Sequence, residues 1–338
     1  MFKRVGTVLG ICIAAFLGVI AFGMILRGPI PERRLKELGI IERDSLFMDV
    51  DGVRTRYIER GEGKKAIIFI HGFASSLSTW RSCLEPISKQ YRIFALDLKG
   101  FGFSGKPASK YTTDEYADFV IHFMDALELQ AATLCGNSMG GNIAWRTALK
   151  YPERIERIIL VDAAGYPSEH RGMPFFLNLG RLPGVGEIVS TFITRGRIRS
   201  SLQSAYYDTA KVTEQTVDAY YYPMRTAGAR RAVLARLRGF PAEIEEWKAK
   251  IRDIKLPTLI IWGADDTWIE REHAERFHRD IIGSALVIIP ECGHLPQEEK
   301  PGEFAISILD FMSEHEDDIL INRPTAPARR VPLTELTV

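Results

Sequence analysis

The sequence predicts an α/β fold in which helices cover both faces of a mostly parallel sheet. Short apolar runs rich in β-branched residues recur at residues 66–70, 92–96, 132–135, 157–161, 258–262 and 285–289. Segments with apolar residues at helical spacing lie between several of these runs, at 113–129, 138–149 and 301–314. Strands buried on both faces need no polar side, so such runs are typical of parallel sheets. Their alternation with helices indicates a doubly wound sheet.

Composition and charge indicate the general class of protein. The chain has 338 residues, 46% of them hydrophobic, and a formal net charge of +1, which is typical of a globular protein. The balanced charge offers no basis for a nucleic-acid partner. Its four cysteines lie far apart in the sequence, and no Gly-rich phosphate-binding motif is present. We therefore expect neither a metal nor an organic cofactor.

Residues 1–27 form the first predicted element, a membrane anchor. The 22 residues from 5 to 26 carry no charge, and as a helix they would span about 33 Å, close to the thickness of the hydrocarbon core. This run is longer than the apolar region of a secretory signal and lacks a small-x-small cleavage pattern. We predict an uncleaved single-pass anchor in contact with membrane lipid, with a cleaved signal as the alternative. Basic residues flank both ends, so the sequence does not predict on which side of the membrane the rest of the chain lies.

Three further segments follow the anchor. Residues 28–43 are predicted to be a polar linker, and residues 44–165 and 255–316 the α/β core, which opens with a hairpin of strands 46–50 and 53–59 joined by Asp-Gly. Between them, residues 166–254 lack the strand pattern and are predicted to form a helical cap. Residues 171–238 of this cap carry a net charge of +7, which suits either a solvated surface or contact with anionic lipid. The tail, 317–338, is predicted to be flexible.

The clearest chemical motif is Gly-Asn-Ser-Met-Gly at residues 136–140, directly after the apolar run 132–135. A serine on a sharp turn from strand to helix exposes its hydroxyl, and glycines two residues to either side prevent collisions with the neighbouring backbone. The start of the following helix also points N–H groups toward developing negative charge. We predict that Ser138 is a nucleophile.

A serine nucleophile needs a base and an acid that orients the base. His294 directly follows the last predicted strand, at the edge where the serine turn is expected. Asp266 lies in the loop after the run 258–262, and the order Ser, acid, His matches one of the known arrangements of the catalytic triad. Two rival acids remain open: Asp265, interpreted as a turn residue, and Asp162, interpreted as a cap at the end of a strand.

Two N–H groups are expected to stabilise the oxyanion of the transition state. One belongs to Met139, the residue after the nucleophile. The other is assigned to Phe73, in the His-Gly-Phe-Ala-Ser segment at residues 71–75 that follows the first buried strand. In this segment His71 is expected to form a hydrogen bond within the loop and not to act as the base.

Taken in order, these motifs resemble the α/β-hydrolase superfamily from about residue 46 to residue 314. The segments that carry the resemblance are Ile-His-Gly-Phe at 70–73, Asp-Leu-Lys-Gly-Phe-Gly-Phe-Ser at 97–104, the serine turn, Trp-Gly-Ala-Asp-Asp at 262–266 and Cys-Gly-His at 292–294. The resemblance implies an eight-stranded, mostly parallel sheet and a cap between strands six and seven. Ser138 differs from the Asp that epoxide hydrolases and haloalkane dehalogenases place at this position.

Within the superfamily, the layout resembles membrane-anchored monoacylglycerol lipases. The expected function is hydrolysis of carboxylic esters with lipid-like or monoacylglycerol-like acyl groups. Aromatic and apolar cap residues would suit such a chain: Phe175, Phe176, Leu177, Tyr220, Tyr221 and Tyr222.

Two alternative functions remain. The meta-cleavage C–C hydrolases share a similar serine turn, although they differ from this chain at Phe73-Ala74-Ser75 and at Leu295. The other is a non-catalytic fold that binds a ligand or partner. The sequence specifies no substrate-binding residues and no oligomeric state.

Overall fold

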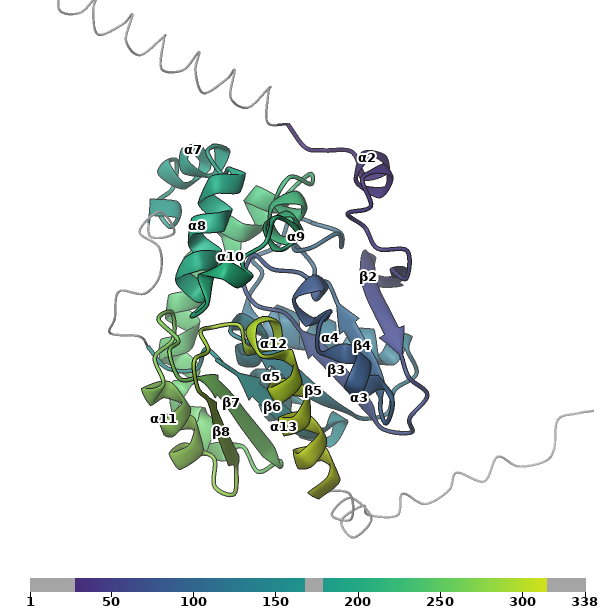
Figure 1. Cartoon of the computed structure of the whole chain (residues 1–338), viewed down its shortest axis with the longest axis vertical. Helices are drawn as coiled ribbons and strands as arrows, with labels where there is room; N and C mark the ends of the chain where they lie inside the picture. Colours follow the sequence, from purple (N-terminus) through teal and green to yellow (C-terminus); the bar gives the residue numbers. More distant parts are fainter. Residues whose placement is uncertain (1–27, 168–178, 315–338) are drawn as a thin grey trace, which may run out of the picture.

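The computed structural model describes residues 28–167 and 179–314. Its centre is one eight-stranded sheet with the order β1-β2-β4-β3-β5-β6-β7-β8 (Figure 1). β2 pairs antiparallel with β1 and β4, and all other neighbours are parallel. The predicted α/β fold and mostly parallel sheet are therefore confirmed. The strands are β1 (Leu46–Val50), β2 (Val53–Arg60), β3 (Ala66–Ile70), β4 (Arg92–Leu96), β5 (Ala132–Asn137), β6 (Ile155–Val161), β7 (Thr258–Gly263) and β8 (Ala285–Ile289).

Helices cover both faces of this sheet. Helices α4 (Thr113–Ala126), α5 (Met139–Lys150) and α11 (Glu272–Asp280) contribute to one apolar cluster, and α3 (Leu84–Ser88) and α13 (Pro301–Glu314) to the other. Along β3, Ile68 and Ile70 belong to the first cluster, whereas Ile67 and Phe69 belong to the second. Because successive side chains of a strand point to opposite faces, an uninterrupted apolar run is what a sheet between two helical layers requires.

The chain between β6 and β7 contains four α-helices in its described part: α7 (Val185–Thr191), α8 (Arg195–Ala205), α9 (Glu214–Met224) and α10 (Ala229–Trp247). In Figure 1 they lie above one edge of the sheet. Arg236 and Glu243, both in α10, form an ion pair in which Arg236 Nη1 lies 2.7 Å from Glu243 Oε2. Glu243 Oε2 also accepts a hydrogen bond of 3.0 Å from the Thr113 N–H at the start of α4, and this contact ties α10 to the core. We call these four helices the cap.

Residues 28–43, which the sequence predicts to be a polar linker, pack against the folded domain. They contain the short helix α2 (Glu32–Glu37), whose Leu35 is fully buried. The Ile30 N–H donates to the Arg225 carbonyl at 2.8 Å, and the Arg225 guanidinium donates to the Gly28 carbonyl at 2.9 Å. This segment therefore joins the cap at the end of α9. One buried leucine in six residues leaves no periodic pattern from which sequence could predict the helix.

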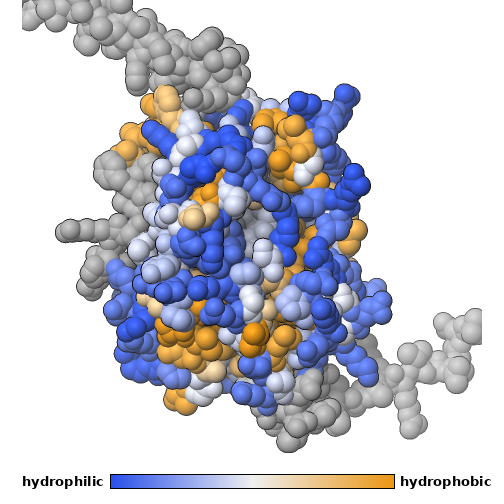
Figure 2. All heavy atoms as spheres, in the orientation of Figure 1, coloured by the Kyte–Doolittle hydropathy of each residue, from blue (hydrophilic) through white to orange (hydrophobic). Residues whose placement is uncertain are grey.

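The predicted anchor, residues 1–27, and the predicted tail, 317–338, lie outside the described residues and stay predictions. Among the helices of residues 28–167 and 179–314, none combines the length and apolar character needed to cross a bilayer. On the face seen in Figure 2, the surface is largely hydrophilic, and its apolar residues form separate patches.

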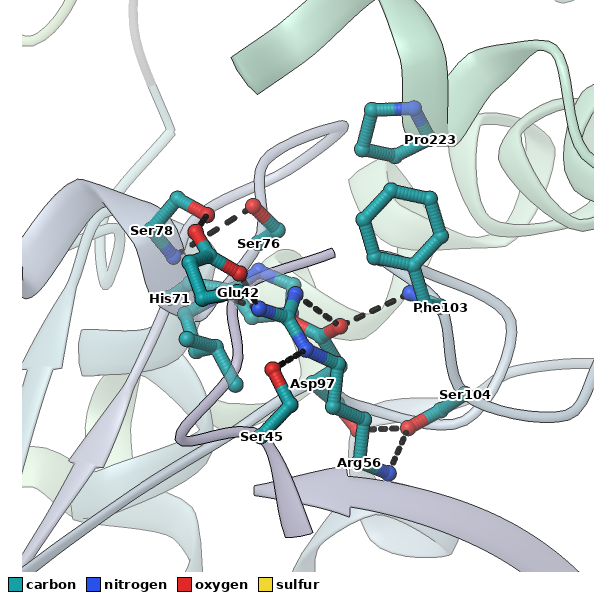
Figure 3. Close-up of polar contacts among 12 residues, drawn as sticks. Glu42, Ser45, Arg56, His71, Ser76, Ser78, Asp97, Phe103, Ser104 and Pro223 are labelled. Atoms are coloured by element: carbon teal, nitrogen blue, oxygen red, sulfur yellow. Dashed lines mark hydrogen bonds and ion pairs between the residues drawn. The ribbon is translucent and has the colours of Figure 1, made fainter. Parts of the chain in front are cut away.

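A buried charge network connects β2, β4 and the loop after β3 (Figure 3). The fully buried Arg56 donates to Asp97 Oδ2 at 3.2 Å, to Ser45 Oγ at 2.9 Å, and to Glu42. Asp97 also accepts from the N–H groups of Leu77 and Phe103, each at 2.7 Å. Every charge in the network thus has a partner, and the network fixes the loop after β3 against the end of β4.

We expect Arg56→Ala to lower the free energy of unfolding by about 3–5 kcal/mol, because the substitution leaves the carboxylates of Asp97 and Glu42 without their buried cation. A matched control is Arg60→Ala, which removes a partly exposed pair with Asp44 and should cost less than about 1 kcal/mol. Urea unfolding of both variants measures the difference. Equal stabilities for the two variants would contradict this assignment.

Candidate active site

Ser138 occupies the strained turn that the sequence predicts. Its backbone has φ 56° and ψ −115°, a conformation that non-glycine residues rarely adopt. Three backbone hydrogen bonds maintain it: the Ser138 N–H donates to Val161 O at 2.9 Å, and the Ser138 carbonyl accepts from Asn142 N at 3.1 Å and Ala164 N at 3.0 Å. The surrounding structure therefore determines the unusual backbone, as is typical of a functional residue.

The two flanking glycines are required by close packing of the backbone. A β-carbon at Gly140 would lie 2.0 Å from the Ile70 carbonyl oxygen, and one at Gly136 would lie 2.2 Å from the Gly140 carbonyl oxygen. We expect Gly140→Ala to displace the serine turn and to abolish detectable activity while also lowering thermal stability. Gly302→Ala is the matched control, since nothing lies within 4 Å of a β-carbon there. Activity and melting temperature are measured for both variants, and both should fall in Gly140→Ala but not in Gly302→Ala. A fully active Gly140→Ala protein would refute the steric argument.

His294 and Asp266 form a buried pair. His294 Nδ1 lies 2.7 Å from Asp266 Oδ2, and Asp266 Oδ1 accepts from the N–H groups of Trp268 at 2.7 Å and Ile269 at 3.1 Å. Both side chains are nearly inaccessible to solvent. An ionised Asp266 selects the imidazole tautomer with its proton on Nδ1, which leaves Nε2 able to accept a proton.

Backbone contacts fix His294 in place. Its N–H donates to the Ala205 carbonyl at the end of α8 at 2.7 Å, and its carbonyl accepts from Asn137 Nδ2 at 3.1 Å. The Trp268 ring lies beside the imidazole, with 5.2 Å between ring centroids. The histidine loop is therefore held by the cap on one side and by the residue before Ser138 on the other.

The structure distinguishes the three candidate acids. Asp265 is exposed, and its N–H donates to the Cys292 carbonyl at 2.9 Å, as expected of a turn residue. Asp162 is fully buried, and its Oδ1 accepts from the Gly263 N–H at 2.9 Å. Of the three, Asp266 is the one whose carboxylate bonds to His294.

The two predicted oxyanion donors belong to residues near Ser138. Met139 begins α5, and Phe73 follows Gly72, where a β-carbon would lie 3.3 Å from Ser138 Cβ. His71 contacts its own loop and the loop after β4: its Nδ1 lies 2.8 Å from the Gly72 carbonyl, and its Nε2 accepts from Leu98 N at 3.1 Å. Burial lowers the pKa of His71, so this imidazole is neutral and is fully occupied in positioning the loop.

An apolar cavity of about 130 Å³ joins this site to the cap. Ser138, His294 and Phe73 line its floor. Its cap side is mostly aliphatic and comes from α7, α8 and α10, through Val189, Ile198, Leu202, Val233, Leu234 and Leu237. Of the cap aromatics named from sequence, Tyr220 lines the cavity, whereas Phe175, Phe176 and Leu177 lie outside the described residues.

Two acids that sequence reasoning missed tie the cap to the histidine loop. Glu298 accepts from Tyr220 and from Thr79 at 2.5 Å each, and also from Tyr206. Glu299 accepts from the backbone N–H groups of Gly293 at 2.7 Å and Tyr207 at 2.9 Å. Both belong to the short helix α12 (Pro296–Glu299). In the sequence, the only indication of a role for these two acids is that they follow His294 by a few residues. That position does not predict which groups their carboxylates bind.

In the part of the chain that the structure describes, one group of side chains converges as metal ligands do. Ligand atoms of Asp162, Asp266 and His294 lie within 4.8 Å of one another. However, His294 Nδ1 and Asp266 Oδ2 are already bonded to each other, and an ion would have to break that bond. The cluster is better described as a histidine with two neighbouring carboxyl groups.

With this geometry in place, comparison with known proteins identifies the family. A family model described as the alpha/beta hydrolase fold matches residues 65–301. The chain belongs to the α/β-hydrolase family. This match contains Ser138, His294 and Asp266 together with the cap, and homologues and structural neighbours of the chain are hydrolases.

Three individual proteins illustrate the range of similarity. The uncharacterized hydrolase YugF of Bacillus subtilis (strain 168) is 29% identical over 265 residues, covering 78% of this chain and 96% of YugF. A meta-cleavage product hydrolase from Pseudomonas fluorescens IP01 shares 29% identity with a TM-score of 0.68, covering 80% of this chain and 97% of that one. A bacterial membrane phospholipase A shares 25% identity with a TM-score of 0.65, covering 93% of this chain and 99% of that one.

Proposed function

We propose that this hydrolase cleaves carboxylic esters with lipid-like acyl groups, such as monoacylglycerols, through Ser138, His294 and Asp266. The observation that carries the proposal is the cavity, whose floor holds Ser138 and His294 and whose walls are aliphatic. An acyl chain gains about 0.8 kcal/mol for each methylene that it buries in such a space. Arg197 and Arg230 also line the cavity, so this gain belongs to the part of the acyl chain that contacts the aliphatic side chains.

We propose the following reaction for these groups. Ser138 Oγ attacks the ester carbonyl carbon as its proton passes to His294 Nε2, and Asp266 stabilises the imidazolium. The N–H groups of Phe73 and Met139 stabilise the tetrahedral oxyanion. As the intermediate collapses, the imidazolium gives its proton to the leaving alcohol and an acyl-serine remains. A water molecule, deprotonated by His294, then attacks the acyl carbon, releases the acid and restores Ser138.

Two further observations support a substrate taken from a membrane. The 22-residue uncharged run near the N-terminus has the length of a membrane anchor. The structural similarity to a membrane phospholipase A extends over 93% of the chain. We therefore propose that residues 1–27 hold the enzyme at a membrane, where the substrate is an amphiphilic ester that reaches the cavity through the cap.

A panel of esters tests this proposal. The full-length protein in detergent or vesicles is assayed with nitrophenyl esters of short, medium and long acyl chains, with monoacylglycerols, and with phospholipids. We expect kcat/KM to rise with acyl length until the cavity is filled. Leu234→Trp, which adds volume to the cavity wall, should shift the preference toward shorter chains. Leu182→Trp, at an exposed cap position, is the matched control and should leave the preference unchanged.

A C–C bond hydrolase acting on meta-cleavage products is the second candidate. The 29% identity with the meta-cleavage product hydrolase and the shared type of serine turn favour it. The same panel therefore includes a dienoate ring-fission product. A kcat/KM for the dienoate far above that of every ester would replace the ester proposal with this one. No turnover of any substrate by folded protein would contradict both.

A further inference from the structure

Asp162 is a buried carboxyl group that the proposed reaction does not use. It directly follows β6 and adopts a φ of 43°, in the left-handed region. Its Oδ1 accepts a hydrogen bond from the Gly263 N–H, whereas its Oδ2, which is inaccessible to solvent, accepts no hydrogen bond from the described residues. Leaving a charged oxygen buried without a donor is costly, so this atom requires an explanation.

The explanation lies in the neighbouring acid. One carboxyl oxygen of Asp162, one carboxyl oxygen of Asp266 and one ring nitrogen of His294 all lie within 4.8 Å of one another. Two carboxyl groups this close in a buried site do not both ionise, because each charge opposes the other. One of them therefore keeps its proton, and a protonated carboxyl group is a hydrogen-bond donor.

The donors around each acid decide which one is neutral. Asp266 accepts hydrogen bonds from the N–H groups of Trp268 and Ile269, and its Oδ2 lies 2.7 Å from His294 Nδ1. Asp162 accepts from one N–H group. Burial, followed by the charge of Asp266, raises the pKa of Asp162 well above its usual range, and the Gly263 hydrogen bond opposes this only in part.

Other titratable groups around Asp162 act in the same direction. The Glu299 carboxylate on α12 adds negative charge and also favours a neutral Asp162. The Cys292 thiol after β8 has its own pKa raised, mainly by burial, so it stays protonated and adds no charge. His294, on the same loop, also lies near Asp162, and its Nδ1 pairs with Asp266 Oδ2 at 2.7 Å.

We propose that Asp162 is a positioning residue of the active site, in which its protonated Oδ2 donates a hydrogen bond to the Asp266 carboxylate. This bond supplies the fourth donor to Asp266 and holds its carboxylate in the plane that binds His294 Nδ1. It also leaves a single negative charge beside the imidazole. The proposal rests on the proposed triad, but it does not depend on which ester the enzyme cleaves.

Infrared spectroscopy tests the protonation state without any substrate. The difference spectrum between wild type and Asp162→Asn at neutral pH should contain the carbonyl stretch of a neutral carboxylic acid. Asp265→Asn, which changes an exposed acid nearby, should remove only a carboxylate band. If Asp162→Asn also removes only a carboxylate band, Asp162 is ionised and the proposal is wrong. This readout is independent of activity, so it distinguishes failure of this inference from failure of the proposed function.

Kinetics test the positioning role on whichever substrate the panel identifies. Asn has nearly the same shape as Asp and keeps an N–H donor for Asp266, so Asp162→Asn should retain at least about a third of the wild-type kcat. Asp162→Ala loses the donor, and we expect kcat to fall by about 10- to 100-fold with KM within about twofold. The rate of phosphonylation by a fluorophosphonate should follow the same order. Equal losses in both variants, or no loss in Asp162→Ala, would overturn the proposal.

Discussion

Replacing Ser138 with Ala should lower kcat by about 10⁴- to 10⁶-fold, the largest effect expected of any side-chain truncation in this protein. The substitution removes the atom that forms the acyl-enzyme, while the cavity and the backbone oxyanion donors remain. Rates are measured with an activated nitrophenyl ester, so that a weak residual reaction stays detectable. Because alanine is smaller than serine and keeps the helix start, we expect no loss of thermal stability.

Ser201→Ala is the matched control for this experiment. Ser201 also lines the cavity, but from α8 in the cap, far along the chain from the strained turn. Its loss should change kcat by less than about threefold, since it lies in no pair with a base. A Ser138→Ala enzyme that retains more than about a hundredth of the wild-type rate would contradict the proposed nucleophile.

Asp266→Asn should be the second most damaging substitution, with a loss of about 10⁴-fold in kcat. An amide in this place presents a donor to His294 Nδ1, which selects the imidazole tautomer protonated on Nε2. That tautomer has no lone pair on Nε2 to accept the serine proton. Asn is close to Asp in size, so the hydrogen bonds from Trp268 and Ile269 to the side-chain oxygen are preserved.

Asp265→Asn provides the matched control one residue away. Its side chain is exposed, and the hydrogen bond that it contributes comes from its backbone, which the substitution leaves intact. We expect kcat within about twofold of wild type. A large loss in Asp265→Asn together with a small loss in Asp266→Asn would move the acid to position 265.

Sequence reasoning predicted the sheet well because the folding signal here is local. Each parallel strand is a short apolar run, and strand–helix alternation left few possible topologies. The serine turn was equally predictable, since Gly136 and Gly140 must lack side chains for the backbone to pack, and that requirement is visible as a spacing. The loops that carry Asp266 and His294 follow strands, so their meeting at one edge also followed from the strand order.

Features that depend on contacts between residues far apart in the sequence could not be predicted in this way. The packing of residues 28–43 depends on Arg225, nearly two hundred positions later in the chain, and no local pattern records that contact. The partners of Glu298 and Glu299 come from the cap, whose helices carry irregular polar and apolar spacing. Asp162 is one of the three candidate acids in the sequence, but the sequence does not show that its carboxyl group lies beside that of Asp266.

The central claim is that the fold makes the Ser138 hydroxyl uniquely nucleophilic by bringing it to the same cavity as His294. The most direct measurement is reaction of the folded, full-length protein with a fluorophosphonate, followed by peptide mass spectrometry to locate the adduct. The account predicts one adduct per chain, on Ser138, which is lost in His294→Ala. An adduct on another residue, or none in folded protein, would contradict it.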